Sequence, residues 1–426
     1  MRPPITGKNK KQSGLLAASE GQVSNLPGRH RTGAIWLVIF QASTIVGMIA
    51  LSVLLLKVIN DSFGYAILSY KVDPATLITA STPLEEMTQD DLIAILQENI
   101  TSGRYQTLAK QKAYLERNPD ELAKLIIQEI AKPQVLATYT LLYSIFNKDE
   151  IIQNAIDEYP GSFLVFRAWL SWDFVTSPQN SDPLTAGVRT AILGSLWTIF
   201  IAVLFAVPVG IGAAIYLEEY AQDNWINRII RTNINNLAGV PSIIYGILGL
   251  AVFVRALEPF TSGALFGIGD STTANGRTIL AAGLTLALLV LPLVIINAQE
   301  AIRAVPRSLR EASFGLGGTR WQTVWYHVLP NAISGTLTGT ILAMSRAIGE
   351  TAPLVVIGAS TFISYNPNSP FSKFTTLPIQ IYQWTARPQD VWRNLSAAAI
   401  IVLLLMLLSL NAIAIVLRNR FSRRLA

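Results

Sequence analysis

Residues 279–301 read ILAAGLTLALLVLPLVIINAQEA, an apolar run with a single charged side chain, Glu300. A helix rises about 1.5 Å per residue, so this run can cross a hydrocarbon core of about 30 Å. Five further apolar segments flank it, at about Ala34–Leu56, Ala186–Tyr216, Leu237–Leu257, Ala332–Ala359 and Leu395–Leu417. The sequence therefore predicts an all-α integral membrane protein with six transmembrane helices.

The composition agrees with a membrane protein and excludes several other classes. Only 14% of the 426 residues are charged, against about 25% in soluble domains, and 51% are hydrophobic. The absence of cysteine excludes disulfides, thiol catalysis and Cys-ligated metal sites. His30 and His327 are too far apart in sequence to suggest a metal site. The net charge of +6 does not indicate nucleic acid, because basic residues gather beside the predicted spans.

These basic residues predict the orientation. They gather in a leader (1–33), in the 303–330 loop and in a tail (419–426). Lys and Arg beside membrane spans favour the cytoplasmic side, so we expect both termini on the cytoplasmic side of a bacterial inner membrane. The predicted parts begin with a basic cytoplasmic tail (1–33), a first span (34–57) and an extracytoplasmic insert (58–185). A membrane core with five spans (186–418) and a second basic cytoplasmic tail (419–426) follow.

The insert is too long to be a simple connector. Thr88 to Asp91 has the spacing of a capping box before an apolar run, which predicts the start of a helix. Asn118–Pro119 places a cap and a first-turn proline before a second apolar pattern. We expect a small, mostly helical extracytoplasmic domain.

Enzyme signatures are not found. The chain lacks a G-x-x-x-x-G-K-[ST] phosphate loop, so we expect no ATP hydrolysis by that route. The acid pairs Glu85–Glu86 and Glu218–Glu219 are adjacent in sequence and so do not share a helix face. Solvated surface is the preferred interpretation of both pairs. No nucleophile–base arrangement is evident, and we expect a protein that is not an enzyme.

The 303–330 loop is the first candidate functional region. Residues 300–330 read EAIRAVPRSLREASFGLGGTRWQTVWYHVLP. The spacing of Ser308 and Glu311 predicts a short helix that starts there. Gly317 and Gly318 should end or bend it, since glycine tolerates unusual backbone angles. A second helical stretch should run to Leu329, before Pro330. An ordinary amphipathic connector is the alternative.

The second candidate region is SRAIGETAPL in the fifth predicted span. Arg346 and Glu350 stand at i and i+4, on one predicted helix face. Arg346 lies about 22 Å along the helix axis from Asn331, well inside the membrane. Charged residues there are usually functional or mutually paired, so the pair could line a pathway or simply steady the bundle. An arginine fork suits an oxyanion.

Small residues and proline shape the same span. Gly335 and Gly339 form a G-x-x-x-G, which favours close helix packing. Pro353 should kink the helix just beyond the charged pair. These residues are therefore predicted to serve packing or hinge motion.

The 303–330 loop resembles the EAA loop of binding-protein-dependent ABC importer permeases. Glu311-Ala312-Ser313 is followed by three residues and then Gly317, and nine more residues lead to His327, Val328 and Leu329–Pro330. Ser313 stands where alanine is usual, and His327 where an aliphatic residue is usual. The resemblance implies a coupling loop that docks on an ATPase subunit through a set of seven residues: Ser308, Glu311, Ala312, Ser313, Gly317, Leu329 and Pro330.

Over residues 186–420 the chain also resembles the PstA-type permeases of phosphate ABC importers. The strings are PVGIGAAIYLEEYA (208–221), LAGVPSIIYGILG (237–249), RAIGETAPL (346–354) and LPIQIYQW (377–384). The resemblance implies a phosphate path past Arg346 and Glu350. It also implies a PstC-type second permease, two copies of a PstB-type ATPase that uses ATP and Mg, and a PstS-type phosphate-binding protein. This chain itself would contact membrane lipids and bind no cofactor.

Other interpretations remain open at this level. An arginine suits any oxyanion, so a permease for sulfate or molybdate fits the same residues. A secondary transporter or channel without an ATPase belongs to a different class, although no internal inverted repeat is apparent. A membrane-anchored sensor is a third class, but it would leave the charged pair and the elaborate loop unexplained.

Overall fold

The computed structural model describes residues 26–77, 87–268, 276–359 and 362–423. Most of the basic leader, the Glu85–Glu86 pair and the last three residues of the tail lie outside these ranges. The chain divides into two compact units, residues 1–58 and 59–426, which are described separately below.

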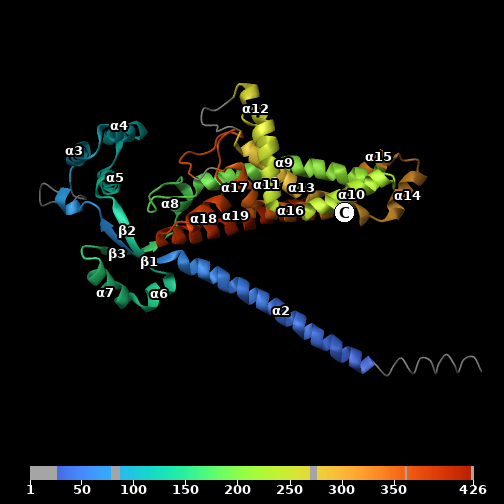
Figure 1. Ribbon diagram of the computed structural model, residues 1–426, viewed down its shortest axis with the longest axis horizontal. Helices are drawn as coiled ribbons and strands as arrows, with labels where there is room; N and C mark the ends of the chain where they lie inside the picture. The colour runs from blue at the N-terminus through green and yellow to red at the C-terminus, as the bar shows by residue number, and fades with distance from the viewer. Residues whose placement is uncertain (1–25, 78–86, 269–275, 360–361, 424–426) are drawn as a thin grey trace, which may run out of the picture. The chain divides into compact units, whose positions relative to one another are not determined.

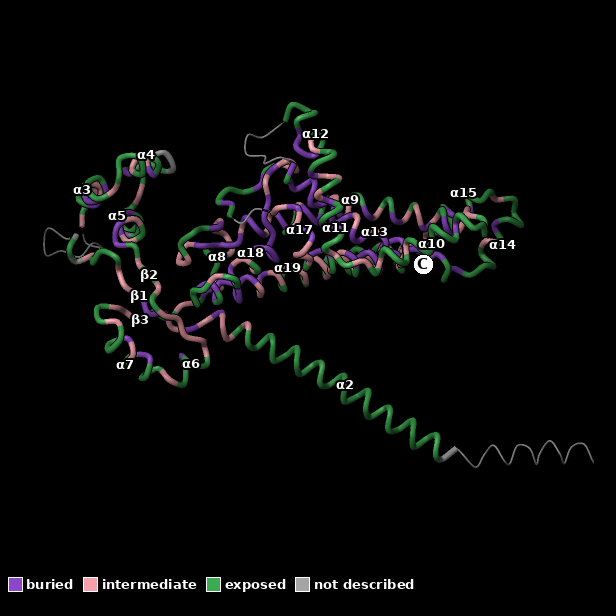
Figure 2. Tube along the Cα trace, in the orientation of Figure 1, coloured by how far each residue is buried: buried purple, intermediate pink, exposed green. Residues whose placement is uncertain are grey.

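The described part of the first unit is helix α2 (Leu26–Asp61), whose last residues belong to the second unit. Its sequence is apolar on all sides, and its side chains are exposed over nearly the whole length (Figure 2). A helix that is apolar all round normally lies in a membrane or inside a protein. The exposed surface of α2 is thus available to lipid or to another chain.

The second unit combines the insert with the membrane core. The core helices are α9 (Arg189–Ile215), α10 (Trp225–Ala238), α11 (Ser242–Gly249), α12 (Glu258–Thr261), α13 (Ile279–Arg303), α14 (Arg307–Gly315), α15 (Arg320–Thr323), α16 (Leu329–Gly349), α17 (Ala352–Ile357), α18 (Leu377–Thr385) and α19 (Asp390–Arg423). Wider π turns extend three of them, at Tyr216–Tyr220 after α9, Leu250–Ala256 after α11 and Val324–Val328 before α16. Short 3-10 turns occur at Pro74–Leu77, Tyr114–Glu116 and Ala264–Phe266.

Four helices of the described chain are long and apolar enough to cross a membrane: Gly28–Asp61, Arg189–Tyr220, Ile279–Arg303 and Asp390–Arg420. A fifth span results if α10 and the α11 segment to Ala256 are taken together, although they bend by 105°. The six predicted continuous spans are therefore found only in part.

The two remaining predicted spans are broken, and proline explains both breaks. Pro241 precedes α11 and disfavours helical backbone at the residue before it. The other helix, α16, ends at Gly349, and Pro353 lies in the first turn of α17. Proline lacks the N–H that a continuous helix needs, so each segment restarts as a new helix.

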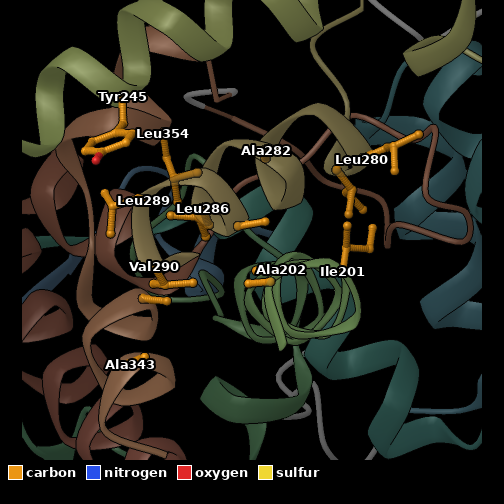
Figure 3. Close-up of a cluster of buried hydrophobic side chains, with 14 of the residues drawn as sticks. Ile201, Ala202, Tyr245, Leu280, Ala282, Leu286, Leu289, Val290, Ala343 and Leu354 are labelled. Carbon is orange, nitrogen blue, oxygen red and sulfur yellow. The ribbon is translucent and has the colours of Figure 1, made fainter. Parts of the chain in front are cut away.

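Helix α13 is the centre of the core, with α9 and α16 packed along it. A buried apolar cluster joins these helices to α11, α17 and α18. Figure 3 shows the side chains of Leu286, Leu289 and Val290 from α13 beside Ala202 of α9 and Leu354 of α17. Within a membrane such side chains stabilise the packing chiefly through van der Waals contact, because lipid tails are as apolar as the side chains themselves.

Small residues allow α16 to approach α13 closely. A Cβ added at Gly335 would lie 2.9 Å from Ala301 Cβ, and one at Gly339 would lie 2.2 Å from Asn297 Cβ. Real Cβ atoms do not approach so closely, so larger residues at these positions would separate the two helices.

The described insert is mostly helical, as predicted, but it also contains a small sheet that the sequence did not predict. Three strands, β1 (Phe63–Tyr70), β2 (Pro133–Thr138) and β3 (Phe163–Ala168), form an antiparallel sheet in the order β2-β1-β3. Each strand is short, and its partners lie far away in sequence. Short apolar runs alone do not separate a strand from a buried helix, which explains the missed sheet.

The described part of the insert also contains six α-helices: α3 (Gln89–Asn99), α4 (Ser102–Gln111), α5 (Pro119–Ile126), α6 (Leu141–Phe146), α7 (Lys148–Glu158) and α8 (Trp172–Thr176). A π turn, Ile127–Ala131, follows α5. Thr88 caps α3 and accepts a hydrogen bond from Asp91 N, and Asn118–Pro119 begins α5, both as predicted. Figure 1 shows α3–α5 on one side of the sheet and α6 and α7 on the other.

One buried amide joins the insert to the core. Asn394, in the first turns of α19, accepts a hydrogen bond from Thr138 Oγ1 at 2.8 Å. Its Nδ2 donates to the Asp61 carbonyl at 2.7 Å. Asn394 is only 5% exposed, so both bonds are sheltered from water. The sheet is thereby held against the start of α19.

Candidate functional site

The 303–330 loop forms a helix, a tight turn and a second helix. Helix α14 begins at Arg307, one residue before the predicted start, with Pro306 as its N-terminal cap. No side chain caps it, so the predicted capping box of Ser308 and Glu311 is not formed. The capping box lies instead at Thr319 and Gln322, where α15 begins. Proline fits a helix start because no N–H needs a partner there.

The turn between α14 and α15 depends on two glycines. Gly317 has φ +82°, a left-handed conformation that other residues rarely adopt. A Cβ added at Gly318 would lie 2.8 Å from Ser313 Oγ. Ser313 is buried, and its hydroxyl lies 2.8 Å from Thr323 Oγ1 on α15. Serine in this position therefore ties α14 to α15, which alanine could not do.

The predicted ATPase-coupling residues are divided between an exposed face and the loop interior. Ser308, Glu311, Ala312 and Gly317 are exposed, Ser313 is buried, and Leu329 and Pro330 are half-buried in the first turn of α16. Apolar side chains on and just after α14 are also exposed, namely Leu309 (37%), Phe314 (46%) and Leu316 (91%). Exposed apolar residues clustered on a short helix are suited to protein contact.

Glu219 anchors α14 and is not solvated surface, which corrects the sequence prediction. Its side chain is only 11% exposed and accepts hydrogen bonds from Arg310 Nε (3.1 Å) and Nη2 (2.7 Å). Arg310 also donates to the carbonyls of Val305 (2.8 Å) and Ile302 (2.9 Å). The end of α9 is thus joined to α14 and to the end of α13.

Glu218 is the largely buried centre of a second ionic cluster beside the first. Its side chain is 10% exposed and accepts from Arg303 (2.7 and 2.8 Å), Arg231 (2.5 Å) and Gln299 (2.8 Å). Arg231 also donates to the Leu217 carbonyl. The cluster connects α9, α10 and α13. In the sequence of the membrane core, arginines outnumber acids. That excess was the one sign in the sequence that Glu218 and Glu219 would be paired with cations.

A cavity of about 490 Å³ opens beside these ion pairs. Its charged lining consists of Glu218, Glu219, Arg303, Arg307, Arg310 and Glu311. Glu311, a predicted coupling residue, therefore shares one cavity with the two carboxylates that hold the loop.

The other candidate pair is formed, but not on one continuous helix. Arg346 lies in the last turn of α16, and Glu350 is the residue that ends this helix. Arg346 Nε lies 3.3 Å from Glu350 Oε1. A cation in the last turn also interacts favourably with the helix dipole. The side chain of Glu350 is 16% exposed and that of Arg346 is 45% exposed.

The position of this pair leaves most of the arginine fork available. Among the described residues, only Glu350 accepts from the Arg346 side chain, through Nε. The Nη groups can still donate to a second anion. Pro353 of α17 lies close to α11, since a Cβ added at Gly246 would be 2.7 Å from Pro353 Cα. The break after Arg346 is therefore packed against another core helix.

The profile of the family "Binding-protein-dependent transport system inner membrane component" matches residues 206–426. The probable ABC transporter permease protein YqgI of Bacillus subtilis (strain 168) is 34% identical over 216 residues, which cover 50% of this chain and 67% of YqgI.

Two relatives carry names that include a substrate. The phosphate transport system permease protein PstA of Haemophilus influenzae is 33% identical over 243 residues, or 57% of this chain and 79% of that protein. The phosphate transport system permease protein PstC of Pasteurella multocida (strain Pm70) is 33% identical over 229 residues, or 50% of this chain and 71% of that protein. The family profile begins inside α9, so it excludes the insert.

Proposed function

Since the chain belongs to the family of binding-protein-dependent transport system inner membrane components, we propose that it is the permease subunit of an ATP-driven importer of inorganic phosphate. The observation that carries this proposal is its 33% identity to phosphate transport permeases of both the PstA and PstC descriptions. The chain is a multi-pass membrane protein, and the family is a transport component rather than an enzyme family.

ATP hydrolysis is assigned to a separate subunit. Two copies of a PstB-type ATPase would use ATP and Mg, one of them docked on the exposed face of α14. Support comes from the exposure of Glu311, Ala312 and Phe314 on that helix. A short helix braced by Arg310 and Glu219 can transmit motion that an unbraced loop would absorb. This chain binds no cofactor in this scheme.

The substrate path is assigned to the surface around Arg346. A PstC-type permease would supply the other half of this path. The Arg346 side chain, which is 45% exposed in this chain, would then face the shared pathway. The guanidinium fork matches an oxyanion through charge-assisted hydrogen bonds. Glu350 would hold the fork in place between transport cycles.

The orientation follows from the basic segments. We place both termini and the α14 loop on the cytoplasmic side of a bacterial inner membrane, with six crossings if the bent α10–α11 pair and the broken α16–α17 segment each count as one. The parts are then the 1–33 tail, the 34–57 span, the 58–185 insert outside, the 186–418 permease core and the 419–426 tail. Lipids would cover α2 and α19. A PstS-type binding protein would deliver phosphate from outside.

A pull-down of the tagged native protein in mild detergent tests the assembly. Recovery with one similar permease and two ATPase copies is expected. Recovery of a chain that transports alone or as a homo-oligomer would favour an ATPase-independent secondary transporter instead.

Competition in uptake assays decides the substrate. Phosphate should compete with labelled phosphate far better than sulfate or molybdate does. Equal competition by sulfate or molybdate would assign the permease to another oxyanion, because the Arg346 fork itself suits all three.

A further inference from the structure

The insert and the membrane core together line an open cavity of about 1040 Å³. The insert contributes residues from α4, α5, the π turn that follows α5, and β2. Residues 180–185 of the insert also line it, and the core contributes the α18–α19 connection and the first turn of α19. The charged and aromatic lining includes Arg104, Glu129, Lys132, Asp182, Arg387 and Trp392.

Arg387 is a half-buried cation in this lining. Its guanidinium carbon lies 3.8 Å from the centroid of the Trp392 ring. Within the described chain, no carboxylate lies within salt-bridge distance of it. Burial lowers the pKa of Arg387, as expected for a cation without a counterion. An arginine stacked on an aromatic ring keeps the donors along its edge free for a ligand.

Lys132 is the matching group on the insert. It has φ +46°, and it is the one non-glycine residue with positive φ in the part of the chain that is described. It follows the π turn Ile127–Ala131, and its N–H donates to the Ile127 carbonyl at 2.9 Å. Lys71 N also holds the neighbouring Ala131 carbonyl at 2.8 Å. Strained backbone that neighbours enforce is frequent where a side chain must be positioned for function.

Among the described residues, the two acids in the lining form no ion pair with Lys132 or Arg387. Glu129 is occupied by Arg104, with Nε–Oε2 and Nη2–Oε1 distances of 3.1 and 2.5 Å. Asp182 Oδ1 accepts from Leu184 N at 3.0 Å, and its charge also acts on Arg167. Neither carboxylate is within salt-bridge distance of Lys132 or Arg387 among the described contacts.

We propose that this cavity is a binding site for a phosphate-type oxyanion, held by Arg387 of the core and Lys132 of the insert. The forked guanidinium gives paired hydrogen bonds and the ammonium a point charge, a combination suited to phosphate oxygens. The anion is either free inorganic phosphate or the phosphate of a lipid headgroup. The free-phosphate case rests on the proposed transport of phosphate and would give the insert a role in collecting substrate.

Equilibrium binding of radiolabelled inorganic phosphate to the full chain, purified in neutral detergent, tests the site. Arg387→Gln and Lys132→Gln should each weaken binding about tenfold or more, since each removes a charge-assisted contact. Arg393→Gln is the matched control. Arg393 is exposed, pairs with Asp390 at 3.1 Å and does not line the cavity, so its loss should leave binding unchanged.

A second arm identifies the source of the anion. The same variants are placed in phosphatidylcholine nanodiscs with or without phosphatidylglycerol, and retained phosphatidylglycerol is quantified after detergent exchange. Phosphate binding that depends on both cations supports the free anion, and lipid retention with the same dependence supports the headgroup. If neither ligand depends on Arg387 and Lys132, the site is overturned.

Phosphate-uptake assays distinguish a failure of this cavity site from a failure of the proposed transport function. An Arg346→Ala chain should lose uptake but keep the cavity's phosphate binding. Normal phosphate uptake by Arg346→Ala would contradict the pathway while leaving the cavity site intact. Loss of cavity binding with Arg393→Gln as much as with Arg387→Gln would contradict the cavity site alone.

Discussion

Arg310 of α14 and Glu219 at the end of α9 form a paired contact, with Nη2 and Nε 2.7 and 3.1 Å from the same carboxylate oxygen. Both side chains are largely buried, at 18% and 11% exposure. The loop that would face an ATPase is therefore fastened to a helix that packs along the centre of the core. Any movement of α14 must be shared by α9 or must break this pair.

Glu219→Ala should loosen α14. It leaves the Arg310 guanidinium without its carboxylate, and we expect a loss of about 1–3 kcal/mol in local stability. Faster proteolysis within 303–330 and reduced phosphate uptake per ATP hydrolysed would report the change. Asp223→Asn is the matched control, because its pair with Arg228 is exposed and should contribute little. Equal proteolysis rates in both variants would contradict the bracing role.

Gly317→Val should distort the α14–α15 turn. The left-handed φ of +82° costs a β-branched residue about 1–2 kcal/mol, although open space surrounds the position. Co-purification of the ATPase subunit should fall. Gly315→Ala is the control, since its Cβ would also meet nothing within 4 Å and its φ lies outside the left-handed region. ATPase recovery equal to wild type in Gly317→Val would argue against docking at this turn.

Arg346→Ala should abolish uptake while assembly persists. The variant removes the guanidinium that would contact the oxyanion and leaves Glu350 without its cation, so at least a tenfold loss is expected. Arg346→Lys keeps the charge but not the fork and should retain part of the activity. Pull-down of the partner subunits checks assembly. Uptake at the wild-type rate would exclude Arg346 from the path.

Asn394→Leu should detach the sheet from α19. It removes the bonds to Thr138 Oγ1 and to the Asp61 carbonyl, and about 1–3 kcal/mol should be lost because these groups are left buried. Hydrogen exchange in β1 and β2 measures the effect. Thr138→Val removes only one of the bonds and should have a smaller effect. Unchanged exchange in both variants would show that the amide does not join insert to core.

Local patterns in the sequence were sufficient for four continuous apolar spans of the described chain, for the starts of α3 and α5, and for the bend after α14, but not for the two predicted spans that are broken. In each case the deciding residues lie within a few positions of one another, as with Thr88 and Asp91 or with Gly317 and Gly318. Arg346 and Glu350 were also paired from spacing alone. The pair is formed even though the helix ends between them, because four residues remain a short distance in space.

Tertiary structure alone decided the features that depend on distant partners. Strand β1 pairs with strands about 70 and 100 positions further along the chain, and its sequence does not specify them. Glu218 and Glu219 became buried anchors only because α10, α13 and α14 bring arginines to the end of α9. Lys132 and Arg387 likewise share a cavity through folding. Hydrophobic patterning indicates which segments are apolar, whereas the partner of each charge is set by how those segments pack.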